Sequence, residues 1–285
     1  MTFLTFSDMA RRDAVRCRCA LAAVLAAIAL GGCASAPTAR GGDEPTRFET
    51  IRARFEKGEF GDAVLLLQEF LGDHPGSRYA DEGIFLLGRA YYEEGNFPEA
   101  EDRFRRILTD YPESPFAADA SYHLGLALLS QSRSPQLDQT ETLSALTQFQ
   151  SFITRYPKSP LVERARGHIA DIRTRLAEKQ YLTGELYLRL KSPKAARFYF
   201  EEKVLGGYAD TPVAAKAMLR LAESYRADGD WAKTAEWAAR LEREHGGRAE
   251  AATARALLEE AAHHGVPAPA EASAPPSGDS ALPKD

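Results

Sequence analysis

The chain has 285 residues, of which 44% are hydrophobic and 27% are charged, and its formal net charge at pH 7 is −5. Nucleic-acid binding depends on clustered Lys and Arg side chains that displace counterions from phosphates, so this acidic balance argues against a nucleic-acid partner. The roughly 210 residues that we expect to be structured can bury a core large enough to fold on its own.

The N-terminus carries the pattern of an export signal. Four arginines lie between positions 11 and 18, and the uncharged apolar stretch Ala20–Leu30 follows them. A basic segment before about ten apolar residues is typical of a secretory signal and is too short to span a bilayer stably. We therefore expect residues 1–32 to be removed, with translation starting at Met1 or Met9.

The apolar stretch ends in Leu30-Gly31-Gly32-Cys33, which resembles the bacterial lipobox. In a lipobox the cysteine sulfur is diacylated and cleavage leaves that cysteine as residue one, so the resemblance implies lipidation of Cys33. Each buried methylene of such chains contributes ~0.8 kcal/mol, and two or three chains give lasting anchorage. The alternative is an uncleaved apolar anchor with an incidental cysteine.

Cleavage before Cys33 changes what remains of the chain. Cys17 and Cys19 leave with the signal, so a lipidated mature chain has neither a free thiol nor a disulfide. Residues 1–32 also hold four Arg and two Asp, so the formal charge falls from −5 to −7. Without disulfides, an exported chain depends on its hydrophobic core for stability.

Composition divides the mature chain into a central region and two flanks. Residues 33–45, rich in Ala, Gly, Pro and Thr, are predicted to be a flexible tether, and residues 264–285, rich in Pro, Ala and Ser, a disordered tail. We expect N-terminal repeats one to three over residues 46–160. Over residues 161–263 we expect a long helix, repeats four and five, and a capping helix.

The central region repeats itself, and this governs the predicted fold. One set of residues recurs 37 positions later: Gly58, Phe60, Ala63, Pro75 and Ser77 are followed by Gly95, Phe97, Ala100, Pro112 and Ser114. Another set recurs 45 positions later: Ala100, Phe104, Tyr111, Pro112 and Ser114 are followed by Ala145, Phe149, Tyr156, Pro157 and Ser159. The additional residues fall in the polar stretch 130–139, where we expect a longer turn. Looser copies follow around Tyr199 and Tyr225.

Each unit is predicted to be a pair of amphipathic helices. In the clearest unit Gly95-Asn96 ends the first helix, and the small residue Gly88 lies where the two helices must approach closely. The unit resembles the tetratricopeptide repeat, whose consensus residues are matched here by Leu87, Gly88, Tyr91, Ala100, Phe104 and Pro112. This resemblance implies an all-α helical solenoid of about five repeats.

The stretch Leu161–Leu190 interrupts the pattern of short helices. Residues 161–190 contain no proline, and their apolar residues lie near helical spacing. At 1.5 Å per residue it would form a helix of ~45 Å, or two helices with a kink near Gly184. We expect it to connect the N-terminal set of three units with the C-terminal pair.

The sequence contains no recognisable catalytic, phosphate-binding or metal-binding motif. Its six histidines are scattered, and His74 and His245 occupy positions where sister repeats have Tyr111 and Tyr156. We therefore expect no enzymatic activity, no cofactor and no metal site.

Repeats of this type offer instead a concave surface lined by the first helix of each pair. Counting from Gly88 predicts these groove residues: Phe48, Arg52 and Phe55 in the first unit, Phe85, Arg89 and Tyr92 in the second, and Tyr122, Leu126 and Leu129 in the third. The fifth unit has the more polar set Leu219, Glu223 and Arg226. Aromatic rings beside arginines favour an extended peptide with an aromatic side chain and a carboxylate. The alternative is that these rings only pack between neighbouring first helices.

The chain as a whole resembles the D lipoproteins of the β-barrel assembly machinery, over about residues 20–245. The most specific likeness lies in Ala145–Phe149, Tyr156–Ser159, Arg173–Lys179, Gly184–Leu188 and Ala222–Tyr225, in this order and spacing. Gly206-Gly207 and Ala209 depart from the pattern. Ala34 after Cys33 is compatible with sorting to the outer membrane, where the anchored protein would face the periplasm.

The resemblance implies a scaffold with several partners. The C-terminal repeats would dock on the membrane-embedded barrel subunit, and the N-terminal three would receive the C-termini of unfolded outer-membrane protein precursors, with room for accessory lipoproteins. Two other classes share some of these features: repeat lipoproteins that coordinate peptidoglycan synthesis or division, and pilus-secretin pilotins. The first does not need the long helix, and the second is built from near-identical 34-residue units.

Overall fold

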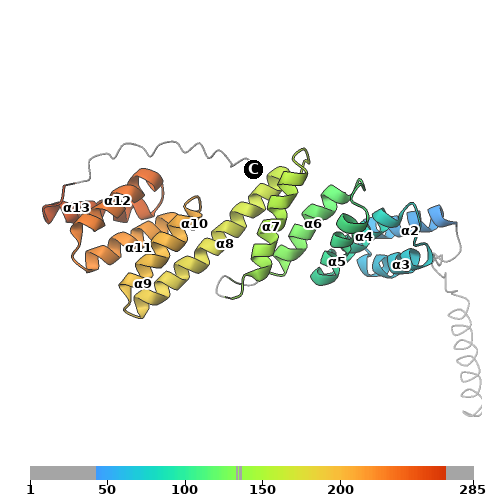
Figure 1. Ribbon diagram of the computed structural model, residues 1–285, viewed down its shortest axis with the longest axis horizontal. Helices are drawn as coiled ribbons and strands as arrows, with labels where there is room; N and C mark the ends of the chain where they lie inside the picture. The colour runs from blue at the N-terminus through green and yellow to red at the C-terminus, as the bar shows by residue number, and fades with distance from the viewer. Residues whose placement is uncertain (1–42, 133, 135–136, 268–285) are drawn as a thin grey trace, which may run out of the picture. The chain divides into compact units, whose positions relative to one another are not determined.

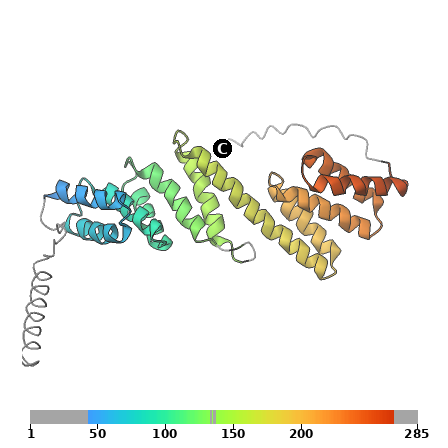
Figure 2. The same ribbon diagram turned by 180° about the vertical axis from the view of Figure 1, so that it is seen from behind.

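The computed structural model describes residues 43–132, 134 and 137–267, and every element within them is helical (Figures 1 and 2). The predicted signal, Cys33, the tether up to residue 42 and the tail from residue 268 lie outside this part of the chain. The described residues belong to two units, one ending at Ala53 and the other starting at Arg54. This boundary falls inside the first described helix, α2 (Glu44–Glu56), whose Phe48 and Ile51 are buried.

The second unit starts with helices that pair in chain order. They are α3 (Phe60–Asp73), α4 (Ala80–Glu93), α5 (Phe97–Asp110), α6 (Ala117–Ser130) and α7 (Thr140–Arg155), and each packs against the next. Figure 1 shows this succession in cyan to green, and Figure 2 shows it from behind. The predicted helix–turn–helix units are therefore confirmed for this region.

The predicted helix break at Gly95-Asn96 is confirmed in atomic detail. Gly95 has a φ of 79°, a left-handed conformation that costs glycine nothing. The Asn96 N–H donates to the Tyr91 carbonyl at 2.8 Å, which closes the end of α4. Lys191 occupies the equivalent place after the long helix, with a φ of 55°, and the next N–H donates to the Tyr187 carbonyl at 2.9 Å.

A glycine backbone meets a phenylalanine ring within each of three helix pairs. A Cβ built on the glycine would lie 2.8, 2.7 and 2.4 Å from the ring in the pairs Gly88–Phe104, Gly125–Phe149 and Gly184–Phe200. These distances are shorter than van der Waals contact, so no larger residue fits without displacing the ring or the helix. The close approach predicted at Gly88 is confirmed and recurs twice.

The long segment forms one continuous helix, α8 (Val162–Arg189), of 28 residues. Gly184 lies inside it as an ordinary helical residue, so the alternative of two separate helices is not what the structure shows. One stretch of α8 packs on α7, and another packs on α9 (Pro193–Phe198) and on the helices that follow. The helix therefore belongs both to the third repeat and to the fourth.

The fourth repeat departs from the predicted regular hairpin. After α9 the chain forms a π-helix, η1 (Tyr199–Leu205), and then the short α10 (Gly206–Tyr208). A π-helical turn holds additional residues without ending the helix. The looser sequence match around Tyr199 and Gly206-Gly207 thus coincides with a real change in helix geometry.

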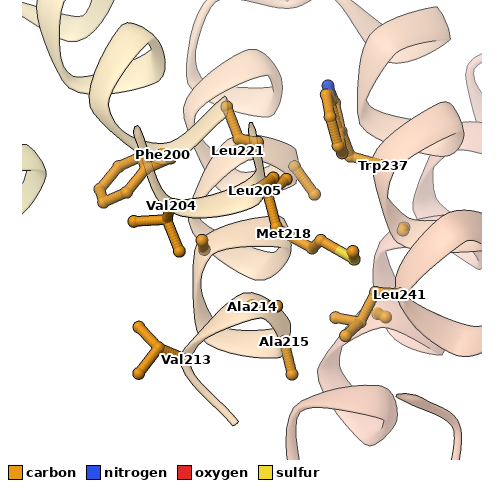
Figure 3. Close-up of a cluster of buried hydrophobic side chains, with 14 of the residues drawn as sticks. Phe200, Val204, Leu205, Val213, Ala214, Ala215, Met218, Leu221, Trp237 and Leu241 are labelled. Atoms are coloured by element: carbon orange, nitrogen blue, oxygen red, sulfur yellow. The ribbon is translucent and has the colours of Figure 1, made fainter. Parts of the chain in front are cut away.

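The remaining helices are α11 (Val213–Ala227), α12 (Trp231–His245) and α13 (Glu250–His263), and the last agrees with the predicted capping helix. Figure 3 shows the core of this region: Phe200 and Val204 of η1 lie on one side of α11, and Met218 of α11 points toward Leu241 of α12 on the other side, near Trp237. All five side chains are buried, Trp237 the least at 5% exposure. This apolar cluster joins the fourth repeat to the fifth.

We expect Gly125→Ala to lower the free energy of unfolding by about 1 to 3 kcal/mol, because the new methyl group overlaps the Phe149 ring. Urea unfolding followed by circular dichroism measures this. The matched control is Gly167→Ala in α8, where an added Cβ meets nothing within 4 Å, and where about 0.5 to 1 kcal/mol of stabilisation is expected from helix propensity. Equal effects of the two changes would contradict the importance of the close approach.

Candidate peptide-binding face

Three of the predicted groove rings are sealed inside the fold. Phe48 is 0% exposed, and Phe85 and Tyr122 are 6% exposed. Phe85 stacks on Phe116 with ring centroids 5.3 Å apart, and Tyr122 lies edge-on to Phe149 at 5.8 Å. These three rings are therefore buried among neighbouring side chains and offer a ligand little surface.

Phe55, Arg89 and Tyr92 keep part of their surface exposed. The Arg89 guanidinium carbon lies 5.4 Å from the centre of the Phe55 ring, which is cation–π distance. Its nearest carboxylate is that of Glu93, at 3.9 Å, too far for a hydrogen bond. Arg89 is thus a cation held against a ring, with donors that remain available.

The predicted residue Arg52 has partners within its own unit. Its guanidinium lies 5.2 Å from the centre of the Phe48 ring and pairs with Glu49 on the same helix. Leu126 and Leu129, from the third unit, are only partly exposed. The predicted set therefore separates into buried rings, partly exposed apolar residues and a few accessible polar groups.

A row of four side chains, which we call the aromatic row, connects α4, α6 and α8: Tyr92, Tyr122, His123 and His168. The Tyr92 and His123 ring centres are 6.5 Å apart, and those of His123 and Tyr122 are 5.7 Å apart. The Tyr122 hydroxyl shares a hydrogen bond with His168 Nε2 at 3.1 Å. Burial raises the pKa of Tyr122, and the positive charge of Arg164 partly offsets this.

The two histidines of this row were not among the predicted groove residues. His123 stacks on Phe104 at 5.6 Å, and His168 stacks on Phe149 at 5.1 Å. Each histidine follows its phenylalanine by 19 residues, so the pair obeys the same 45-residue spacing as the rest of the two repeats. That spacing is the signal that identifies them as equivalent positions.

The corresponding surface of the C-terminal repeats is closed by ion pairs. Arg220 Nε lies 2.8 Å from Glu185 Oε1 in an approach that is not aligned as a hydrogen bond, and Arg220 Nη1 donates to Glu223 at 2.7 Å. Arg226 pairs with Glu260 at 3.1 Å. The polar set predicted for the fifth unit is therefore occupied internally.

The segment Arg173–Lys179 ties α8 to the loops on either side of it. Arg173 makes a two-pronged pair with Asp210, at 2.9 and 2.6 Å, and also donates to the Gly207 carbonyl. Arg175 donates to the Ser132 hydroxyl at 2.6 Å, and Lys179 donates to the Leu137 carbonyl at 2.8 Å. These contacts give a structural reason for the basic residues of this segment.

Three exposed apolar side chains lie at the end of α8 and on α9. Leu186, Leu190 and Phe198 are 44%, 64% and 48% exposed, and we call them the hairpin patch. The Lys203 ammonium lies 5.2 Å from the centre of the Phe198 ring. Apolar surface of this kind with a basic rim is typical of a protein contact.

The described residues, 43–132, 134 and 137–267, contain neither a metal-binding cluster nor a membrane-spanning helix. No group of three or more His, Cys, Asp and Glu side chains among them could hold a metal ion. None of their helices combines the length and the apolar character needed to cross a membrane.

Protonation of His123 should make the fold sensitive to acid. Burial, with a contribution from Arg89, lowers the pKa of His123 from 6.5 to about 4, so the unfolded chain binds more protons between these values. Stability attributed to neutral His123 is complete above pH 6.5 and falls as the pH drops toward 4. At pH 5 we expect a loss of about 2 kcal/mol, which His123→Phe removes.

Urea unfolding of both proteins at pH 7.5 and pH 5 measures this difference. The control is His263→Gln at the exposed end of α13, which should follow the wild type. Equal losses in the wild type and His123→Phe would show that the His123 imidazole is not held neutral.

Comparison with known proteins supplies the family. Residues 43–241, or 199 of the 285, match the model of the YfiO outer membrane lipoprotein family. The outer membrane protein assembly factor BamD of Rickettsia prowazekii (strain Madrid E) is 34% identical over 88 residues, which are 31% of this chain and 35% of that protein. This chain thus aligns with about a third of the length of that relative.

Solved structures with similar helix arrangements include TTC0263, a thermophilic TPR protein of Thermus thermophilus. It is 15% identical, with a TM-score of 0.35, over 77% of this chain and 99% of that one. The TPR2AB domain of yeast Sti1, solved in a pHSP90 complex, is 13% identical, with a TM-score of 0.38, over 74% of this chain and 86% of that one.

The YfiO family model covers well over half of the length of this chain. The chain therefore belongs to the YfiO family of outer membrane lipoproteins.

Proposed function

We propose that this protein is a non-enzymatic scaffold of the β-barrel assembly machinery, anchored in the outer membrane through lipid on Cys33 and facing the periplasm. Membership of the outer membrane lipoprotein family supports the location, and the name of the Rickettsia relative supports a role in outer membrane protein assembly. The lipobox-like Leu30–Cys33 supports the anchor.

The N-terminal repeats bind the C-termini of unfolded barrel precursors. The single observation that carries this is the Arg89 guanidinium, held 5.4 Å from the Phe55 ring centre with its nearest carboxylate 3.9 Å away. A guanidinium with free donors can bind a terminal carboxylate in a bidentate manner. The partly exposed ring of Tyr92 provides apolar surface for an aromatic last residue.

The C-terminal repeats dock on the membrane-embedded barrel subunit through the hairpin patch. Leu190 and Phe198 are each about half exposed or more, although large apolar side chains are normally covered. Arg220 on α11 is paired with Glu185 on α8, so this neighbouring surface is occupied by ion pairs. The exposed apolar surface lies instead at the turn between α8 and α9. Burial of such side chains in an interface favours association.

Reversing the charge of Arg89 should weaken peptide binding. We expect Arg89→Glu to reduce affinity for a peptide ending in phenylalanine with a free carboxylate by about tenfold, because hydrogen bonds to charged groups contribute about 1.5 to 3 kcal/mol. Fluorescence anisotropy measures binding, and circular dichroism checks that helicity is unchanged.

The control for this experiment is Arg106→Glu on α5, where the wild-type arginine pairs with Asp110 at 3.2 Å. It changes the net charge equally and should leave binding within about twofold. An affinity that is indifferent to Arg89→Glu would remove the proposed carboxylate site.

Changing the hairpin patch should release the docking partner. We expect Leu190→Glu with Phe198→Glu to abolish co-purification of a large barrel protein after mild detergent extraction, because a charge cannot be buried in an apolar interface without a partner. The control is Leu65→Glu on α3, a leucine that is 67% exposed. Recovery of a cell-wall synthase or a secretin from the wild type would favour one of the two other classes.

A further inference from the structure

We propose that Arg164 is a second cationic anchor for the bound peptide, so that the face selects chain termini with an acidic residue upstream of the terminal aromatic one. This inference rests on the proposed function of Arg89. Arg164 lies in the first turn of α8 and is exposed. Within the part of the chain that the structure describes, it forms no hydrogen bond or ion pair.

The position of Arg164 follows from its neighbours on α8 and α6. It precedes His168 by four residues and therefore shares a helix face with it. His168 in turn bonds to the Tyr122 hydroxyl at 3.1 Å, and the charge of Arg164 acts on the same hydroxyl to lower its pKa. Arg164 therefore lies beside the α8 end of the aromatic row.

Arg89 lies at the other end of the same row. It precedes Tyr92 by three residues on α4 and therefore shares a helix face with it. The Tyr92 ring is 6.5 Å from that of His123, which is 5.7 Å from that of Tyr122. The row thus runs from one cation to the other. Each interaction that defines it is a contact between described side chains of the unit that starts at Arg54.

The side chains between Arg89 and Arg164 offer a ligand few free hydroxyl groups and no additional charge. The Tyr122 hydroxyl is already bonded to His168, and the Tyr92 hydroxyl is 3.2 Å from Ser130 Oγ. Burial and Arg89 lower the pKa of His123, so this ring adds no positive charge near pH 7. Tyr122 is buried beneath the row, so a ligand that crosses it meets the partly exposed rings of Tyr92, His123 and His168 in the middle and positive charge at each end.

The length of the aromatic row gives the register of the second charge. The ring centres of Tyr92 and His123 are 6.5 Å apart, those of His123 and Tyr122 are 5.7 Å apart, and those of Tyr122 and His168 are 6.0 Å apart, so the row is at most about 18 Å long. An extended chain covers this distance with about five or six residues. The matching ligand is therefore an extended C-terminal segment with an aromatic last residue and an Asp or Glu about five residues before it.

The test compares two peptides with the same phenylalanine terminus, one with Glu and one with Gln five residues before it. Fluorescence anisotropy is measured with the full chain in mild detergent. We expect the Glu peptide to bind the wild type about three- to tenfold more tightly, and Arg164→Glu to remove that preference while leaving the Gln peptide within about twofold. A Lys peptide should regain affinity for Arg164→Glu.

Arg166→Glu is the matched control. It removes an exposed arginine two residues away on the same helix, which pairs with Glu163 at 3.4 Å, and it should preserve the preference for Glu. If Arg166→Glu and Arg164→Glu act equally, or if the wild type does not distinguish the two peptides, the second anchor is overturned. Binding of the Gln peptide that depends on Arg89 would still uphold the proposed function, whereas its absence would overturn both.

Discussion

The structure depends on the contact between a glycine backbone and a phenylalanine ring inside its helix pairs. Because glycine has no Cβ, the partner helix can approach until the ring lies on the backbone, and interiors packed at this density tolerate no added methyl group. The two residues are 16 positions apart in Gly88–Phe104 and Gly184–Phe200 but 24 apart in Gly125–Phe149. The longer connection of the third repeat is therefore looped out without altering the helix packing.

The same phenylalanine rings connect the hairpin cores to the candidate face. Phe104 touches Gly88 with one part of its ring and stacks on His123 with another, and Phe149 does the same with Gly125 and His168. Each histidine thus packs at the contact between one repeat and the next. Because this packing buries Phe85 and Tyr122, the face is left with few accessible groups, and Arg89 is prominent among them.

The repeat architecture could be predicted because it is set by spacing. The 37- and 45-residue periods place Gly88, Gly95 and Phe104 in their roles, and the structure confirms them. A period cannot show how far a ring protrudes, since exposure depends on side chains from the next repeat. This is why Phe85 was equally consistent with a groove and with a core.

Two other features could not be predicted from the sequence, for different reasons. The π-helix at Tyr199–Leu205 leaves no residue signature beyond a weaker repeat match, because it is a change in hydrogen bonding between residues of ordinary helix propensity. The hairpin patch was missed because Leu186 and Leu190 follow the helical apolar spacing of a core. Their exposure depends on which helices pack on the last turns of α8, and the spacing of apolar residues does not show that.

The two halves of the second unit use different physical forces at their surfaces. In the C-terminal repeats the arginines are internally satisfied: Arg197 donates to the Ser224 carbonyl at 2.8 Å and lies 4.0 Å from the Tyr225 ring centre. At the α8–α9 turn the apolar side chains of Leu190 and Phe198 are exposed beside the charged Arg189, Lys191 and Lys194, and apolar burial is little affected by salt. At the other end Arg89 and Arg164 have donors that are not hydrogen-bonded to any other described residue, and their attraction for a carboxylate is screened by salt. Since α8 is a single helix fixed to loops on both sides, the two surfaces can be engaged together without competing for the same residues.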